Sequence, residues 1–362
     1  MIPILHLRQG TALYGADRAV LALSASTESP YLPIVGAIAR PGSPDALADE
    51  ARRRGIEAVR FESASRFDLR CARAVARLAL EKDVRLLHAH DFKALFVALV
   101  AGWIARVPVV ATFHGDTHGT AAVRLYEGVA RVLANFTRGV AAVSRALERQ
   151  LRRWVRVAPV AFVPNGLPPA EPISRTERAA ARARLRVDAD AYAIALVGRL
   201  APEKGHRILF EAARGLGATL LIAGDGPLRD LLPGAGRGLD VRFLGYLDDA
   251  RDVFAAADVV ALPSLTEGLP LTALEALALG RCLVASAVGE LPDLLAGGAG
   301  VLVPPGDSAA LAEALRRLRA GAGRAAIEAR ALERARDYGV AAMAEAYASL
   351  YRRALSGASS SR

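Results

Sequence analysis

Apolar and polar positions follow one repeating pattern along the chain. Short apolar runs recur, and longer amphipathic stretches with the period of a helix separate them. Strands that are apolar on both faces, each followed by a helical stretch, are typical of parallel sheets covered by crossover helices. The pattern therefore predicts an α/β fold built from doubly wound parallel sheets.

The first half of the chain contains one such series. Its predicted strands are Ile2–Leu7, Pro33–Ile38, Ala58–Phe61, Arg85–Ala89, Val107–Thr112, Gly139–Val143 and Ala161–Val163. Its predicted helices include Gly15–Leu23, Asp45–Arg54, Leu69–Lys82 and Ala141–Trp154. The longest apolar run, Ala94–Ala105, fits a buried core helix better than a membrane span, which needs about 20 residues.

A proline-rich break at Pro164-Asn165-Gly166 and the prolines after it separates this series from a second one. The predicted strands of the second series are Tyr192–Gly198, Thr219–Ala223, Val241–Leu244, Asp258–Leu262, Arg281–Ala285 and Gly300–Val303. Only helices follow, and we expect the last, Ala341–Ala354, to pack back across the domain junction. We therefore expect an N-terminal domain over residues 1–167, a linker over 168–190, a second domain over 191–338, and a crossover helix with a tail over 339–362.

Composition narrows the class of protein. Hydrophobic residues make up 53% of the chain and charged residues 23%, which indicates a globular protein with large cores. Cys71 and Cys282 are too few and too far apart for a disulfide framework or a zinc site, so a reducing cytosol is expected. Met1–Leu7 resembles a strand rather than a signal peptide.

The positive charge is concentrated in the first half. Residues 1–167 hold 23 Lys and Arg against 14 Asp and Glu, a net +9, whereas residues 168–362 hold 24 against 23, a net +1. The stretch Ser144–Val157 carries five arginines around Leu147, Leu151 and Trp154, and a predicted helix over Ala121–Thr137 adds Arg124 and Arg131. Such a surface could dock on anionic lipid headgroups, with a solvated arginine-rich face as the alternative. A nucleic-acid partner would explain the charge but not the second half of the chain.

Two carboxylates stand out in an apolar segment. Glu267 and Glu275 lie eight positions apart in Thr266–Gly280, where a loop with Gly and Pro leads into a predicted helix. Eight helical residues rise about 12 Å. Carboxylates that frame a helix N-terminus, itself an anion site, predict a pocket for a ligand that carries both phosphate and hydroxyls.

Two strand-to-helix turns add further polar chemistry. Val197-Gly198-Arg199-Leu200 with Lys204-Gly205 places a guanidinium and an ammonium at the carboxyl end of a strand, where they could bind a diphosphate or remain as solvated surface cations. The second turn is Gly224-Asp225-Gly226-Pro227. The three-glycine dinucleotide fingerprint and the P-loop pattern are both absent, so hydride transfer and nucleotide triphosphatase chemistry lose support.

In order along the chain, these motifs resemble the donor domain of the retaining family 4 glycosyltransferases. Phe243-Leu244-Gly245-Tyr246, Ala257-Asp258, Pro263-Ser264 and Val303-Pro304-Pro305-Gly306-Asp307 continue the resemblance, which covers about residues 192–315. The first half is similar more loosely, through Gly15-Ala16-Asp17, His88-Ala89-His90-Asp91, Thr112-Phe113-His114-Gly115, Val143-Ser144 and Val163–Leu167. The family more often has two glycines and a Glu at the first of these motifs.

The resemblance implies a GT-B fold, with two facing Rossmann-like domains, and a site for a nucleoside-diphosphate sugar. Arg199 and Lys204 would bind the donor diphosphate, Glu267 and His114 would contact the transferred sugar, and Glu275 would accept hydrogen bonds from the ribose. The remaining implied donor contacts are Gly198, Tyr246, Gly268, Leu269 and Thr272. Gly15 and Ala16 would form the acceptor or phosphate loop.

The resemblance also implies retaining transfer of a hexose without a divalent metal or other cofactor, to a glycan or lipid-linked acceptor. A nucleotide-sugar epimerase-like enzyme of the same fold and an inactive binding protein remain alternatives. His88 and His90 are two positions apart on a predicted strand, so we expect them on opposite faces and not around one metal. We expect a cytoplasmic protein that docks at the inner face of the cell membrane.

Overall fold

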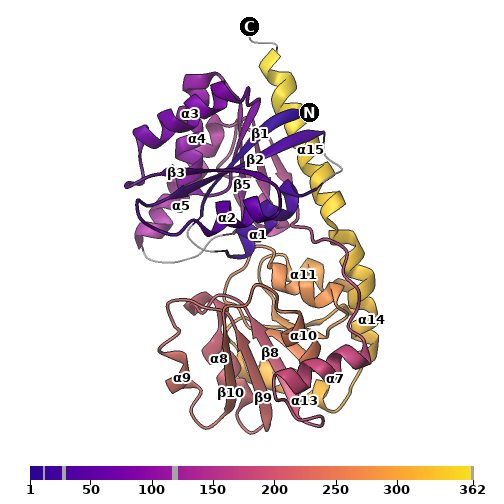
Figure 1. The fold of residues 1–362 in the computed structure, drawn as a ribbon. Helices are drawn as coiled ribbons and strands as arrows, with labels where there is room; N and C mark the ends of the chain where they lie inside the picture. Colours follow the sequence, from indigo (N-terminus) through magenta and orange to yellow (C-terminus); the bar gives the residue numbers. More distant parts are fainter. Residues whose placement is uncertain (11–12, 27–29, 116–120, 360–362) are drawn as a thin grey trace. The chain divides into compact units, whose positions relative to one another are not determined.

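A computed structural model describes residues 1–10, 13–26, 30–115 and 121–359. The chain forms two compact units, one made of residues 1–168 with 339–362 and the other of residues 169–338 (Figure 1). We call them the first and second unit and describe each by itself.

A seven-stranded parallel sheet forms the centre of the first unit, in the order β3-β2-β1-β4-β5-β6-β7. Its strands are β1 (Ile2–Gln9), β2 (Tyr31–Ala39), β3 (Glu57–Glu62), β4 (Leu86–Ala89), β5 (Val109–Phe113), β6 (Gly139–Ala142) and β7 (Val160–Phe162). The strand order reverses between β1 and β4. In an open α/β sheet, ligands bind at the carboxyl ends of the strands beside such a switch point.

Helices cover both faces of this sheet, and side chains set where several of them begin. They are α1 (Gly15–Ser24), α2 (Ala46–Arg53), α3 (Leu69–Glu81), α4 (Phe92–Ala105), α5 (Ala121–Leu133) and α6 (Arg145–Leu151). The side chains of Asp45, Asp68, Asp91 and Ser144 accept hydrogen bonds from backbone amides in the first turns of α2, α3, α4 and α6.

The last helix, α15 (Val340–Ser359), belongs to the first unit although the second unit precedes it in the chain. The amide of Val340 donates to the carbonyl of Leu167 at 2.9 Å, which joins the start of α15 to the end of the first segment. Tyr347, Leu350 and Tyr351 of α15 are then buried in a core with residues of β1, β4, β5 and β6. The predicted return of the C-terminal helix is therefore confirmed.

A six-stranded parallel sheet forms the second unit, in the order β10-β9-β8-β11-β12-β13. Its strands are β8 (Tyr192–Val197), β9 (Ala218–Ala223), β10 (Asp240–Gly245), β11 (Val259–Leu262), β12 (Leu283–Ser286) and β13 (Val301–Val303). The order reverses between β8 and β11, so this sheet has a switch point too.

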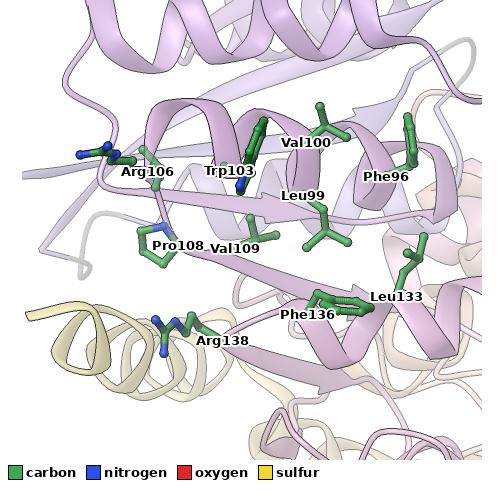
Figure 2. A pocket seen from close by; sticks show the side chains of 12 residues that line it. Phe96, Leu99, Val100, Trp103, Arg106, Pro108, Val109, Leu133, Phe136 and Arg138 are labelled. Carbon is green, nitrogen blue, oxygen red and sulfur yellow. The ribbon is translucent and has the colours of Figure 1, made fainter. Parts of the chain in front are cut away.

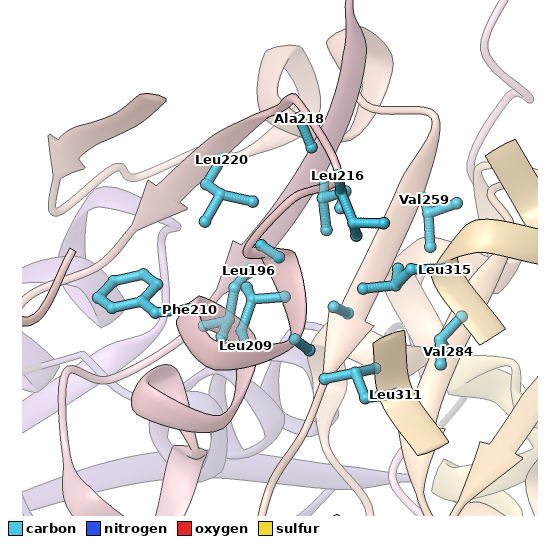
Figure 3. Close-up of a cluster of buried hydrophobic side chains, with 14 of the residues drawn as sticks. Leu196, Leu209, Phe210, Leu216, Ala218, Leu220, Val259, Val284, Leu311 and Leu315 are labelled. Carbon is cyan, nitrogen blue, oxygen red and sulfur yellow. The ribbon is translucent and has the colours of Figure 1, made fainter. Parts of the chain in front are cut away.

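The helices of the second unit are α7 (Arg175–Arg184), α8 (His206–Ala213), α9 (Leu232–Ala235), α10 (Arg251–Ala256), α11 (Leu271–Ala278), α12 (Leu291–Leu294), α13 (Ser308–Arg319) and α14 (Arg324–Ala335). One core of the second unit lies between this sheet and α8 and α13 (Figure 3), and a second one lies between the sheet and α7 and α10. Leu196 and Leu220 from the strands belong to one buried cluster with Phe210 from α8 and Leu315 from α13. The predicted fold class, two doubly wound parallel-sheet domains, is confirmed.

Some predicted helices are shorter than the sequence pattern indicated. The helix expected over Ala141–Trp154 is only α6, a helix of seven residues, because Ala141 and Ala142 belong to β6 and turns follow Leu151. The helix expected over Ala121–Thr137 ends at Leu133 and continues as the 3₁₀ turn η1 (Ala134–Phe136). The side chain of Arg124 lies outside the described residues. In the described part of the chain, none of the helices combines the length and the apolar character that crossing a bilayer requires.

Candidate functional site

The second unit brings two of the predicted catalytic residues into direct contact. Lys204 lies in the 3₁₀ turn η2 (Pro202–Lys204) after β8, and Glu267 lies in the loop after β11, on the other side of the switch point. The ammonium of Lys204 donates to Oε1 of Glu267 at 2.6 Å, and the hydroxyl of Ser264 donates to the same oxygen at 2.8 Å. The Glu267 side chain is only 8% exposed. Two charge-assisted or polar contacts to one oxygen hold this buried carboxylate in position.

Backbone packing holds these two loops together. The amide of Leu265 donates to the carbonyl of Glu203 at 2.8 Å. Gly205 has φ +70°, and a Cβ there would lie 1.9 Å from the carbonyl oxygen of Pro263. Because only glycine permits this approach, Gly205 allows the Lys204 turn to reach the Glu267 loop.

A third loop packs on the first. Gly224 follows β9, and a Cβ at this residue would lie 1.9 Å from the carbonyl oxygen of Gly198. The amide of Gly224 donates to the carbonyl of Gly245 at 2.7 Å, immediately before Tyr246, whose side chain is exposed. The turn at Gly224-Asp225-Gly226 therefore serves the packing of the loops that carry Arg199 and Tyr246.

The two predicted carboxylates do not share a helix. Helix α11 starts at Leu271 after Pro270, so only Glu275 is helical and the rise of about 12 Å expected for eight helical residues does not apply. Thr272 and Glu275 lie on the partly exposed side of α11, opposite its buried leucines. The hydroxyl of Thr272 donates to the carbonyl of Val197 at 3.2 Å, which ties the first turn of α11 to the end of β8.

Gly268 and Leu269 are buried in the same loop. The amide of Glu290 donates to the carbonyl of Gly268 at 2.8 Å, and a Cβ at Gly289 would lie 2.3 Å from the carbonyl oxygen of Glu267. The turn after β12 therefore packs against the backbone of the Glu267 loop and supports it. Gly198 differs from these packed glycines, because a Cβ added there would have no atom within 4 Å and its φ is outside the left-handed region.

The first unit gathers a different set of polar residues at its switch point. His6 of β1, His88 of β4 and His90 after β4 are all buried. Nδ1 of His6 lies 3.1 Å from Nε2 of His90, and Nδ1 of His90 lies 3.3 Å from Nε2 of His114. Burial lowers the pKa of His6 to about 4 and, with the charge of Arg8, that of His114 to about 3. These imidazoles are therefore neutral near pH 7.

The expected separation of His88 and His90 is wrong. Their ring centroids lie 3.9 Å apart, because β4 ends at Ala89 and the strand alternation does not continue to His90. His6, His88 and His90 are close enough for one metal ion. However, both ring nitrogens of His88 are already engaged, at 2.7 Å from the Tyr351 hydroxyl and 2.7 Å from Oγ1 of Thr112. A hydrogen-bonded cluster therefore fits these contacts better than a metal centre.

Gly15 and Ala16 begin α1 beside the same cluster. Nε of Arg8 donates to Asp17 at 2.5 Å, the other Asp17 oxygen accepts from the Tyr14 amide at 2.9 Å, and Arg8 also donates to the carbonyl of His90 at 3.0 Å. This buried ion pair ties the α1 loop to the end of β1. Gly15 is exposed, with no atom within 4 Å of a Cβ position and φ outside the left-handed region. The fold therefore does not itself require glycine there.

Arg8, Asp17 and Ser264 are site residues that sequence reasoning did not assign. Arg8 is the one cation within the apolar strand Ile2–Gln9, and Asp17 stands where the family more often has Glu. Charge in an otherwise apolar strand was the available signal for Arg8. Ser264 belongs to the Pro263-Ser264 motif, but its contact with Glu267 follows only from the structure.

Comparisons with known proteins agree with this architecture. Residues 191–320 match the family model described as glycosyl transferases group 1, and residues 35–171 match the model described as glycosyltransferase family 4. A D-inositol 3-phosphate glycosyltransferase of Kineococcus radiotolerans is 32% identical over 363 residues, covering 85% of this chain and 82% of that protein.

The chain belongs to the family 4 glycosyltransferases.

Another relative of this glycosyltransferase is a phosphatidyl-myo-inositol mannosyltransferase of Mycobacterium leprae, 33% identical over 255 residues. That alignment covers 67% of this chain and 66% of the mycobacterial protein, slightly less than two thirds of its length. Among solved structures, HepE of Anabaena in complex with UDP and glucose is similar at a TM-score of 0.86 and 25% identity, covering 97% of this chain and 100% of that chain.

The first unit of the glycosyltransferase also has an open apolar groove of about 1260 Å³ on its surface, between α4 and the segment that leads into β6. Figure 2 shows Phe96, Leu99 and Trp103 of α4 on one side and Leu133 and Phe136 on the other. Trp103 is 84% exposed and Phe136 is 74% exposed. The apolar stretch Ala94–Ala105 is therefore not the fully buried helix that its sequence predicted.

Proposed function

We propose that this chain transfers a sugar from a nucleoside-diphosphate sugar to a glycan or lipid-linked acceptor, with retention of the anomeric configuration. The observation that carries the proposal is the 2.6 Å contact between Lys204 and Glu267 at the switch point of the second sheet. It joins a cation suited to a diphosphate to a carboxylate suited to sugar hydroxyls. The family membership and the glycine-dependent packing of the surrounding loops support the same interpretation.

Arg199 and Lys204 bind the donor diphosphate in this proposal. Negative charge grows on the diphosphate as the glycosidic bond breaks, so fixed cations beside it stabilise the transition state more than the ground state. With no ligand, Glu267 neutralises Lys204. On donor binding, the diphosphate becomes a second partner of the ammonium, and Glu267 accepts hydrogen bonds from hydroxyls of the transferred sugar.

The other proposed donor contacts lie in these loops and in helix α11. Glu275 accepts from the ribose, and the backbone around Tyr246 contacts the base. The amides of Gly268 and Leu269 contact the sugar. Gly198 leaves room for the diphosphate, because the space that a Cβ would occupy there holds no other atom of the protein within 4 Å. Thr272 acts by holding α11 against β8, through its bond to Val197.

The first unit supplies His114 to the sugar and the Gly15–Ala16 loop to the acceptor or a phosphate. The acceptor hydroxyl attacks the face from which the diphosphate departs, and a departing phosphate oxygen takes the proton of that hydroxyl. The bond from the sugar to the diphosphate breaks as the bond to the acceptor oxygen forms. This reaction needs no protein nucleophile, unlike retaining glycosidases with their carboxylate pair about 5 Å apart.

The proposal is tested by turnover across a panel of nucleoside-diphosphate sugars. A thermal-shift screen with uridine, guanosine and adenosine diphosphates first selects the base, because a bound ligand raises the unfolding midpoint. Hydrolysis or transfer is then followed with wild type, Lys204→Ala and Glu267→Ala. We expect both variants to lose turnover, and unchanged turnover in both would contradict the site assignment.

The same assay separates the alternatives. An epimerase-like enzyme would release an altered or free sugar without an acceptor and would not extend one. An inactive binding protein would show the thermal shift but no consumption of donor. A transferase consumes donor in proportion to the glycosylated acceptor, and the anomeric configuration of that product tests retention.

We further propose that the acceptor is held at an anionic membrane surface, in the synthesis of a glycolipid or cell-surface polysaccharide. The phosphatidyl-myo-inositol mannosyltransferase among the relatives supports a lipid-linked acceptor. The groove of the first unit supports the docking, because Trp103 and Phe136 are exposed beside the exposed cations Arg106 and Arg138. Among the described residues, neither guanidinium has a carboxylate partner. Apolar side chains with unpaired cations suit anionic headgroups.

Vesicle co-sedimentation tests the docking. Wild type should bind vesicles that contain phosphatidylglycerol more strongly than pure phosphatidylcholine vesicles, and both Trp103→Ala with Phe136→Ala and Arg106→Gln with Arg138→Gln should weaken that binding. Leu80→Ala, at an exposed apolar position of α3, is the control. Equal binding to both kinds of vesicle would contradict membrane docking without affecting the transfer proposal.

A further inference from the structure

Three histidines of the first unit form one continuous chain of contacts. His6 comes from β1, His90 follows β4 and His114 follows β5, three neighbouring strands of the sheet. Nδ1 of His6 lies 3.1 Å from Nε2 of His90, and Nδ1 of His90 lies 3.3 Å from Nε2 of His114. His90 thus uses both ring nitrogens to connect a buried strand residue to His114.

A chain of neutral imidazoles restricts where its protons lie. Each neutral ring has one N–H donor and one lone pair, so every contact pairs a donor with an acceptor. If His114 donates from Nε2 to His90, then His90 must donate from Nε2 to His6, and all three rings carry the proton on Nε2. In the opposite arrangement, all three rings carry it on Nδ1.

The two arrangements differ in intrinsic energy and in what they present to a ligand. The tautomer with the proton on Nε2 is the one that a histidine side chain favours in water, and here three rings must adopt the same tautomer together. Nδ1 of His114 is buried and makes no hydrogen bond to the described residues. With the proton on Nε2, this nitrogen offers a lone pair.

We propose that His6 and His90 hold His114 in the Nε2–H tautomer, so that Nδ1 of His114 accepts a hydrogen bond from a hydroxyl of the transferred sugar. His6 and His90 are positioning residues, and His114 makes the contact. The identity of the ligand rests on the proposed function, whereas the tautomer of His114 is a property of the protein without ligand. The lone pair on Nδ1 of His114 accepts from a hydroxyl but cannot pair with a ligand group that only accepts hydrogen bonds.

His88 supplies a matched control. Its ring is buried and its centroid lies 3.9 Å from that of His90, but its nitrogens contact Tyr351 and Thr112 instead of the other histidines. His88→Gln should therefore lower the unfolding midpoint without altering the tautomer of His114. If changes at His90 alter the tautomer of His114 and His88→Gln does not, the effect comes from the chain of contacts and not from general packing.

Nuclear magnetic resonance of the ligand-free full chain, labelled with ¹⁵N-histidine, tests the tautomer directly. Each imidazole is assigned by its loss in a single His→Gln variant. We expect His114 to show a protonated Nε2 and an unprotonated Nδ1. His90→Leu should give a mixture of tautomers at His114, and His90→Gln should keep one, because an amide can both accept from His114 and donate to His6. A proton on Nδ1 of His114 in wild type would overturn the proposal.

Kinetics with the donor selected by the panel adds a second readout. We expect His90→Leu to lower kcat/KM roughly tenfold, about the effect of one lost hydrogen bond, and His90→Gln to restore most of it. Donor analogues carry hydrogen or fluorine in place of each sugar hydroxyl in turn. At the contacted position, both replacements should lower kcat/KM equally in wild type, and neither should lower it further in His114→Ala. A fluorine that substitutes for the hydroxyl would show that His114 donates, which overturns the proposal. Failure of every donor would contradict only the proposed function.

Discussion

In each unit, polar side chains gather at the switch point of a parallel sheet. The side chains of the first unit are neutral there, whereas those of the second unit are charged. The first unit buries His6, His88 and His90, whose pKa values are all lowered by desolvation, so that the rings stay neutral. The second unit places Lys204 and Glu267 as a charged pair 2.6 Å apart. Both sets lie at the carboxyl ends of strands beside a switch point.

The difference indicates which part of a ligand each unit suits. Neutral imidazoles exchange hydrogen bonds with hydroxyls and gain little from a net charge. A fixed ammonium and guanidinium favour a diphosphate, above all when its charge grows during bond breakage. A nucleoside-diphosphate sugar contains both kinds of group, so the contrast predicts separable effects of mutations in the two units.

The largest effect is expected from removing charge in the second unit. Lys204→Ala should lower kcat by roughly 10²–10³-fold, because the cation acts on charge that develops in the transition state. The control is Lys82→Ala, which removes a lysine that lies 3.1 Å from Glu57 in an exposed pair. Steady-state kinetics with the selected donor measures both. Equal losses in the two variants would remove the special role given to Lys204.

The glycines of the second unit sharpen the contrast between packing and binding. Gly205→Ala should lower the free energy of unfolding by more than about 2 kcal/mol, because φ is +70° and the new Cβ meets the Pro263 carbonyl oxygen. Gly198→Ala should leave stability within about 0.5 kcal/mol but weaken donor binding, since only a ligand needs that space. Urea unfolding and donor titration distinguish the two. A strongly destabilised Gly198→Ala protein would refute this distinction.

Glu267 should affect the sugar more than the nucleotide. Glu267→Gln keeps the size of the side chain but weakens acceptance from sugar hydroxyls, so affinity for the intact donor should fall about tenfold. Affinity for the free nucleoside diphosphate should fall less, because Lys204 remains. Calorimetric titration of both ligands measures the split. A greater loss for the free diphosphate would assign Glu267 to the phosphates instead.

The last prediction concerns acid and the first unit. The pKa of His6 is about 4 in the fold and 6.5 without it, so the unfolded chain takes up the proton first as the pH falls. The stability from neutral His6 is complete above about pH 6.5 and is lost towards pH 4, at about 1.4 kcal/mol per pH unit. Urea unfolding across this pH interval gives the slope of the free energy of unfolding against pH. In His6→Gln this slope should be smaller by the contribution of one proton. Identical slopes would mean that His6 does not titrate as its burial implies.

Much of the fold and part of the site could be predicted from the sequence. Both sheets follow from apolar runs, because a strand covered on both faces shows its pattern locally. The assignment of Lys204 and Glu267 to one site came from the order of family motifs. Their direct contact could not be predicted, since the two residues are 63 positions apart and meet only through the packing of Gly205.

Other features depend on where elements end, and sequence patterns define ends poorly. Glu267 lies outside α11 because the helix begins after Pro270, and His90 joins His88 because β4 stops at Ala89. The ion pair of Arg8 with Asp17 depends on how α1 returns to the end of β1. Each of these is a tertiary contact between residues whose local sequence is compatible with several arrangements.

The most direct test of the charged donor site is calorimetric titration of wild type, Lys204→Ala and Lys82→Ala with the nucleoside diphosphate that stabilises wild type most. If Lys204 binds the diphosphate, its variant should bind at least roughly tenfold more weakly, while Lys82→Ala should match wild type. Equal affinity in all three proteins would contradict the donor site at Lys204 and Glu267.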